Sequence, residues 1–199
     1  KIKQIKGQNR QYLAHEYFNR DWHPMHFATM AKWLEPAKLT YACSAHYLDY
    51  VESVNLTPEQ QAFLKDIHDP MFKQTVLDFM VNQQFRKDYW VKGGRRLNRL
   101  EQAEAFRQQK VILAVHRADV SLKVNGANGE AAMQEAVYGP ILDALADHKP
   151  KTLGQLEQSL QSKGITLAQL TQAAMVLSAS GTLLAVQDEA LIPKAKKHT

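Results

Sequence analysis

The sequence has little cysteine, glycine or proline, and each shortage excludes a class of protein. A single cysteine, Cys43, excludes a disulfide framework and fits a reducing compartment. Nine glycines and seven prolines in 199 residues exclude collagen-like and low-complexity chains. The sequence contains no run of about 18 apolar residues that would predict a membrane span, and its N-terminal stretch lacks the apolar region of a signal peptide. We therefore expect a cytoplasmic protein. The chain opens with Lys1 rather than methionine, which we interpret as the start of a piece of a longer protein.

The sequence also lacks the common catalytic motifs. It contains no G-x-G-x-x-G, no phosphate-binding G-x-x-x-x-G-K-[ST] and no G-x-S-x-G. His15 and Glu16 begin like a zinc-protease motif, but Asn19 stands where the second histidine ligand belongs. We therefore predict no catalytic, cofactor-binding or metal-binding residue in this chain. Two pairs with ligand spacing leave a zinc site as a weaker alternative: His23 with His26, and Cys43 with His46.

Basic residues are concentrated in one part of the chain. The net charge is +5, and residues 86–99 carry six basic side chains against one acid, Asp88. The alternatives are a solvated turn or a docking surface for an acidic partner. The candidate contact residues are Arg86, Lys87, Lys92, Arg95, Arg96 and Arg99. Arg86 differs from the others, because it follows Phe85 and could pair internally with Asp88 or another carboxylate.

Start signals and apolar spacing predict an α+β fold that is mainly helical. A capping box at Thr57 and an Asp69-Pro70 start predict two consecutive helices, the second burying a stripe of Phe72, Val76, Phe79 and Met80. Further helices are expected at 8–18, 24–35 and 98–109. Strands are expected at 39–44, 85–91 and 110–116, with 119–124 pairing beside the last.

The last third of the chain predicts a domain of its own. A helix at 134–147 precedes two more with capping boxes at Thr152 and Thr166, and two short apolar runs, 182–186 and 190–192, then predict a hairpin. Three helices followed by a hairpin is the winged-helix order. The third helix lacks Lys and Arg, and residues 134–193 hold three lysines against six acids. We therefore expect a winged helix that contacts protein rather than DNA.

The stretch from Asn55 to Gly93 resembles the predicted methyltransferase regulatory domain family. The resemblance rests on Thr57 to Gln60, on Asp69-Pro70, on a D-F-x-x-N-x-x-F-R-x-D core and on Gly93; the core residues are Asp78, Phe79, Asn82, Phe85, Arg86 and Asp88. Two upstream runs, 12–19 and 38–45, are similar to segments of the same family. The winged-helix tail resembles the segment C-terminal to this region in bacterial protein lysine methyltransferases of this type.

This resemblance implies a division of labour within a longer enzyme. The family region lies C-terminal to a class I S-adenosylmethionine (SAM)-dependent methyltransferase domain, which would bind SAM. This chain would then be a non-catalytic regulatory and substrate-recognition region, with Tyr12, His15 and Glu16 as acceptor-side candidates. Its partners would be the methyltransferase domain and a protein substrate, without membrane or nucleic acid.

The expected organisation has three parts. Residues 1–130 form the regulatory-type α+β domain, 131–193 the winged-helix-like domain and 194–199 a flexible basic tail. Two other functions remain possible from the sequence. One is a stand-alone winged-helix DNA-binding transcriptional regulator. The other is an independent enzyme that uses His15, Glu16 or the histidine and cysteine pairs.

Overall fold

A computed structural model describes residues 6–21 and 23–191 of the chain. The basic tail predicted at 194–199 lies outside these residues. The described α-helices are α2 (Arg10–Tyr17), α3 (Phe27–Leu34), α4 (Glu52–Asn55), α5 (Pro58–Lys65), α6 (Pro70–Val81), α7 (Arg99–Gln108), α8 (Glu135–Ala144), α9 (Leu153–Ser159) and α10 (Leu167–Ala179). The strands are β1 (Leu39–Ser44), β2 (Asp88–Lys92), β3 (Lys110–Leu113), β4 (Lys123–Gly126), β5 (Gly129–Ala132), β6 (Lys151–Thr152) and β7 (Leu183–Ala185). Short 3-10 helices are η1 (Glu35–Ala37), η2 (Tyr47–Tyr50), η3 (Arg117–Asp119), η4 (Gln161–Lys163) and η5 (Glu189–Leu191).

The helix starts predicted from the capping boxes and from Asp69-Pro70 are confirmed, whereas the helix expected from residue 24 begins at Phe27. Thr57, Thr152 and Thr166 each accept a hydrogen bond from the backbone amide three residues later, and the backbone amide of each threonine donates to the side chain of the glutamine there. Asp69 caps α6 by accepting from two backbone amides of its first turn. Each reciprocal pair satisfies donors that a helix leaves unpaired at its N-terminus, which is why the sequence alone places these starts well.

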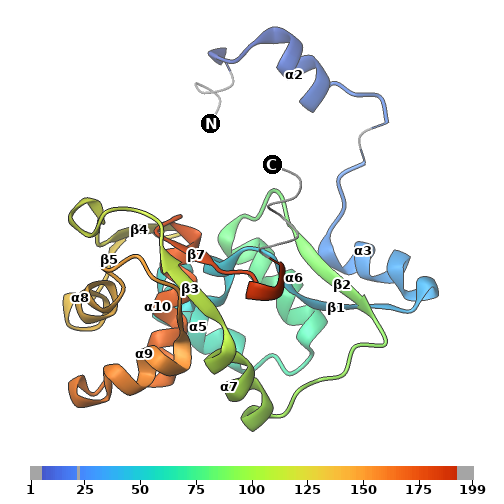
Figure 1. Cartoon of the computed structure of the whole chain (residues 1–199). Helices are drawn as coiled ribbons and strands as arrows, with labels where there is room; N and C mark the ends of the chain where they lie inside the picture. Colours follow the sequence, from blue (N-terminus) through green and yellow to red (C-terminus); the bar gives the residue numbers. More distant parts are fainter. Residues whose placement is uncertain (1–5, 22, 192–199) are drawn as a thin grey trace.

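The described strands form small antiparallel sheets, so the α+β expectation is confirmed in outline (Figure 1). β1 pairs with β2, and β3 lies between β6 and β7. The expected pairing of 119–124 with the strand at 110–116 is wrong. β4 instead forms a hairpin with β5, because the Asn125 to Gly129 turn folds the chain straight back on itself.

The wing of the predicted winged helix does not form among the described residues. β7 pairs with β3, where Leu113 lies opposite Leu183 and both are almost fully buried. The second apolar run, 190–192, does not extend a hairpin, because Glu189–Leu191 form η5 and Ile192 lies outside the described residues. β3 offers β7 an apolar strand to pair with. The predicted hairpin would have offered only a short run after the polar turn at 187–189. The three helices occur in the predicted order, but the winged-helix assignment is not confirmed.

The hydrophobic core lies mainly in the C-terminal half. It is built from the inner faces of α8, α9 and α10 together with β3 and β7, and it extends to Val51 and Val54 beside α4. β3 precedes residue 130 and yet pairs with two strands that come after that residue. The sheet and the core therefore draw on both sides of the predicted boundary, and the division into 1–130 and 131–193 stays a prediction.

The buried stripe predicted for α6 is not buried within this chain. Phe72 is 57% exposed and Phe79 is 68% exposed, while Val76 and Met80 are only partly covered. No residue of α2 is buried either, and Figure 1 shows α2 standing apart from the rest of the molecule. The helical spacing is correct, but among the described residues the Phe72 and Phe79 side of α6 stays mostly exposed, with the His26 ring at 5.4 Å from that of Phe79 as a partial cover.

Candidate functional site

Arg86 joins two helices and a two-stranded sheet through one guanidinium group. Its Nη1 lies 2.6 Å from Oδ1 of Asp78 in α6, and its Nε lies 2.9 Å from Oδ2 of Asp88 in β2. Its Nη2 donates to Gln74 in α6 at 2.9 Å and to the Tyr41 hydroxyl in β1 at 3.4 Å. The Arg86 side chain is 18% exposed, and those of Asp78 and Asp88 are 21% and 10% exposed.

The aromatic rings around Arg86 hold its charge in an apolar setting. The guanidinium carbon lies 4.3 Å from the centre of the Phe27 ring, which packs edge-on against Tyr41 and stacks on Trp90. Burial opposes the charged form of Arg86, but the hydrogen bonds to Asp88 and the charges of both aspartates outweigh it and raise its pKa. Burial also raises the pKa of Asp78, an effect that Arg86 reduces without cancelling. Arg86 therefore stays charged and ties α3 and α6 to the β1–β2 sheet.

Asn82 positions this cluster by ending α6. It adopts a left-handed backbone conformation with φ of +52°, which asparagine tolerates better than most residues. Its amide donates to the carbonyls of Asp78 and Phe79, so the chain turns back toward β2 directly after the helix. Asp78, Asn82, Arg86 and Asp88, four residues of the sequence motif, therefore act together in fixing one turn. Phe79 and Phe85, the aromatic residues of the same motif, remain exposed.

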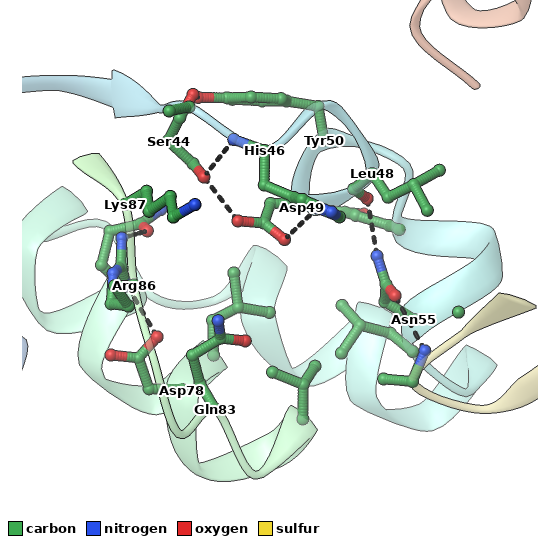
Figure 2. A pocket seen from close by; sticks show the side chains of 18 of the residues that line it. Ser44, His46, Leu48, Asp49, Tyr50, Asn55, Asp78, Gln83, Arg86 and Lys87 are labelled. Carbon is green, nitrogen blue, oxygen red and sulfur yellow. Dashed lines mark hydrogen bonds and ion pairs between the residues drawn. The ribbon is translucent and has the colours of Figure 1, made fainter. Parts of the chain in front are cut away.

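A pocket of about 680 Å³ lies next to the Arg86 cluster (Figure 2). It is bounded by the segment after β1, by α6, by the approach to β2 and by the turn of the β4–β5 hairpin. Lys73 and Lys87 line it, and within the described part of the chain neither ammonium group forms a hydrogen bond or an ion pair. Figure 2 shows the Lys87 side chain pointing into the pocket. Because apolar side chains such as Leu48, Leu56 and Val81 also line the pocket, two free cations there suit a ligand that carries both carboxylates and apolar groups.

Ser44, His46 and Asp49 meet at the pocket wall, but not as a nucleophile and its base. Oγ of the buried Ser44 donates to Oδ2 of Asp49 at 2.5 Å and accepts from the His46 amide at 3.0 Å. Nδ1 of His46 lies 3.4 Å from the other Asp49 oxygen. The carboxylate therefore stands between hydroxyl and imidazole, whereas serine nucleophiles are activated by an imidazole that accepts their proton. The arrangement fixes the turn after β1.

The opposite wall of the pocket is held by Asn55. Its Nδ2 donates to the Leu48 carbonyl at 2.6 Å, and its Oδ1 accepts from the Ala127 amide at 3.0 Å (Figure 2). The second bond links residues 72 positions apart and holds the hairpin turn against α4. Gly126 in the same turn lies so close to α4 that a Cβ there would stand 2.0 Å from the Val54 carbonyl oxygen.

The structure separates the sequence-predicted contact residues into three groups. Arg86 pairs with Asp78 and Asp88 of the same chain, as its position in the sequence suggested. Lys87 faces the pocket. Exposed positions on β2, on the segment after it and at the start of α7 hold Lys92, Arg95, Arg96 and Arg99, and Arg95 pairs with Glu101 at 2.9 Å. The acceptor-side candidates Tyr12, His15 and Glu16 lie exposed on α2, which Figure 1 shows away from the basic segment. The structure therefore does not unite the two sets.

Sequence reasoning missed most of the pocket. Ser44, His46, Asp49, Asn55 and Lys73 come from three separate segments, and no spacing rule connects them. The only sequence signal was the basic excess around Lys87.

The paired histidines and cysteine do not gather around a common point. His26 packs its ring against Phe79 at 5.4 Å, and His46 contacts Asp49. In the described ranges, no three His, Cys, Asp or Glu side chains are placed to share a metal ion. No helix of those ranges is both long and apolar enough to cross a bilayer.

Comparisons with known proteins agree with this architecture. Residues 9–92 match the family described as a predicted methyltransferase regulatory domain, so the resemblance inferred from the sequence motifs is confirmed over that stretch. The matched stretch contains the Arg86 cluster and most of the pocket.

Two relatives extend the likeness beyond the matched domain. An uncharacterised Synechocystis protein, sll1526, is 40% identical over all 199 residues of this chain, which spans 39% of its length. The structure of PKMT2 from Rickettsia typhi has a similar fold, with a TM-score of 0.59 at 17% identity over 93% of this chain and 40% of that protein. A second structure of PKMT2, in complex with AdoHcy, matches equally well at 19% identity. The chain thus spans about two fifths of both relatives.

Proposed function

We propose that this chain is the non-catalytic regulatory and substrate-recognition region of a class I SAM-dependent methyltransferase of the protein-lysine type. The observation that carries the proposal is the match of residues 9–92 to the methyltransferase regulatory domain family. The likeness in fold to PKMT2 supports the enzyme class, and the Synechocystis relative supports a longer polypeptide. The comparisons do not favour a stand-alone DNA-binding regulator. A single partly buried thiol, Cys43, is compatible with the cytoplasm.

The chain's own residues do not fit a SAM site. Nucleotide-like cofactors use a glycine-rich turn between a strand and a helix, where backbone amides stay free to approach the ligand. The most closely spaced glycines outside the Gly93-Gly94 pair, Gly126 and Gly129, lie in an antiparallel hairpin turn, and the Val54 carbonyl fills the space beside Gly126. We therefore assign SAM to another part of the enzyme and route no chemical step through this chain.

The pocket beside Arg86 is the candidate contact for the protein substrate. Its free ammonium groups, Lys73 and Lys87, can pair with carboxylates of an acceptor segment, while the bonded Asp49 and Asp78 keep the walls in place. Such contacts position an acceptor and contribute to its binding without touching the methyl group. Loss of these cations would then raise KM for the acceptor more than it lowers kcat.

The test uses the longer methyltransferase polypeptide with Lys73→Glu and Lys87→Glu combined. We expect a several-fold rise in KM for the protein acceptor and unchanged SAM affinity in calorimetric titration. The matched control combines Lys149→Glu and Lys163→Glu, which change the net charge equally but lie outside the pocket. Micromolar SAM binding by this chain alone, or an acceptor KM equal to that of the control, would contradict the proposal.

A further inference from the structure

α6 presents an aromatic ridge that this chain leaves in solvent. Phe72 and Phe79 are seven residues apart, almost two helical turns, so they lie on the same side of α6. They are 57% and 68% exposed, and no residue of this twelve-residue helix is buried. Large apolar side chains gathered on one face mark an interaction surface more often than single exposed ones do.

A groove runs beside this ridge, between α3 and α6. It has a volume of about 510 Å³, and its apolar lining comes from Met25, Phe27, Met30, Leu34, Phe79 and Trp90. The His26 ring lies 5.4 Å from that of Phe79 at the groove edge. The charged groups that reach the groove, Asp78, Arg86 and Asp88, already satisfy one another. An apolar occupant would therefore leave no charge unpaired.

The family-matched stretch lacks apolar cover of its own. Of the 23 buried hydrophobic side chains among the described residues, five fall within 9–92, namely Phe27, Val51, Val54, Leu56 and Leu64. The C-terminal half buries the remainder, and the core that it forms takes in only Val51 and Val54 from the matched stretch. An 84-residue domain needs a larger apolar contact area than five buried side chains provide. Much of the apolar surface of the matched stretch, including Phe72, Phe79 and Phe85, is therefore left open to a contact from another surface.

We propose that the ridge of Phe72 and Phe79 and the adjoining groove, together the α3–α6 face, dock the remaining part of the methyltransferase polypeptide through an apolar segment. The inference rests on the proposed function. It is supported by length, because about three fifths of each relative lies outside the region that this chain matches. A second copy fits less well. A twofold contact brings the same surface against itself, and like charges would then face each other, because Lys87 precedes and Lys92 ends the strand whose Trp90 lines the groove.

Hydroxyl-radical footprinting tests the proposal without depending on methyl transfer. Phe72, Phe79 and Met30 should be oxidised several-fold more slowly in the longer polypeptide than in this chain. Phe63 on α5, 57% exposed, and Leu100 on α7, 83% exposed, are matched controls outside the groove and should react equally in both. Equal oxidation of Phe79 in the two proteins would overturn the proposal, even if the regulatory function survives its own test.

Variants distinguish the possible occupants. Phe72→Ser with Phe79→Ser should leave the thermal midpoint of this chain close to that of Phe63→Ser, and should restore oxidation of Met30 in the longer polypeptide. Protection that depends on protein concentration would mean that a second copy covers the face, against the proposal. The face could also be protected from oxidation in this chain already. If Tyr12→Ser with Phe18→Ser then abolishes that protection, α2 covers the α3–α6 face, which also contradicts the proposal.

Discussion

Nη1 of Arg86 lies 2.6 Å from Oδ1 of Asp78, and this contact joins the segment that leads into β2 to the last turn of α6. The same guanidinium group bonds Asp88 and lies over the Phe27 ring. One side chain thereby fixes the relative position of α3, α6 and the β1–β2 sheet, on which both the pocket and the α3–α6 face depend.

Arg86→Ala should destabilise the fold strongly. It leaves two mostly buried carboxylates, Asp78 and Asp88, without a counter-charge, and breaking such a pair costs about 3 kcal/mol or more. Arg86→Lys should recover only part of the stability lost in Arg86→Ala, because an ammonium group restores the charge but cannot reproduce the forked contact. Denaturant unfolding measures both. Arg95→Ala, which removes an exposed pair with Glu101, is the control and should cost under about 1 kcal/mol. Equal losses for Arg86→Ala and Arg95→Ala would show that the cluster is not a structural centre.

The Asp78 carboxyl should make stability fall as the pH rises through its titration. Burial raises its pKa in the folded state above the ordinary value of 3.8, so the folded protein holds this proton more tightly than the unfolded chain. The stabilising effect of that proton is complete below pH 3.8 and is lost as the pH passes the raised pKa. The unfolding free energy of the wild type minus that of Asp78→Asn should therefore decrease across this interval. A difference that increases there would mean that attraction to Arg86 outweighs burial.

Gly126→Ala should separate the β4–β5 hairpin from α4. The added methyl group would stand 2.0 Å from the Val54 carbonyl oxygen and 2.7 Å from its carbon, and backbone cannot move aside cheaply. We expect a loss of about 2 kcal/mol in thermal or denaturant unfolding. Gly94→Ala provides the comparison, since its methyl group would meet only the side chain of Val91, and it should cost less. Similar losses for the two variants would refute the close contact.

Charge reversal at Arg95 and Arg96 should slow methylation of the acceptor without unfolding the protein. Both side chains are exposed, so Arg95→Glu with Arg96→Glu should change stability little. In the longer enzyme each charge should affect the free energy of acceptor association by up to about 1 kcal/mol. Methylation by the variant should also depend less on salt than methylation by the wild type. Steady-state kinetics over a range of ionic strength measure this. If neither activity nor its salt dependence changes, the segment from Lys92 to Arg99 is a solvated turn.

The chain should not bind duplex DNA specifically. α10 carries no Lys or Arg, and residues 134–193 hold twice as many acids as lysines, so phosphates would be repelled. A gel shift at physiological salt should show no retained complex. A shift that persists there and weakens on Gln169→Ala or Gln172→Ala would restore the DNA-binding alternative.

The sequence by itself determined the features that depend on neighbouring residues. The capping boxes at Thr57, Thr152 and Thr166, the Asp69 cap and the turn before Gly129 were all predictable, because each partner lies within a few positions. The motifs between Thr57 and Gly93, taken together, also indicated the family whose model matches residues 9–92. An internal partner for Arg86 could be anticipated from Asp88, two residues away.

Only the tertiary structure decided which distant segments meet. β7 pairs with β3 rather than forming a wing, since the strand partner with the most apolar surface lies about 70 residues earlier. Asp78, Gln74 and Tyr41 converge on Arg86, and Lys73 joins Lys87 in one pocket, through packing that no local spacing encodes. The periodicity of α6 correctly marked an apolar side at Phe72 and Phe79. Periodicity shows that a face is apolar, whereas what covers that face depends on which other surface reaches it in space.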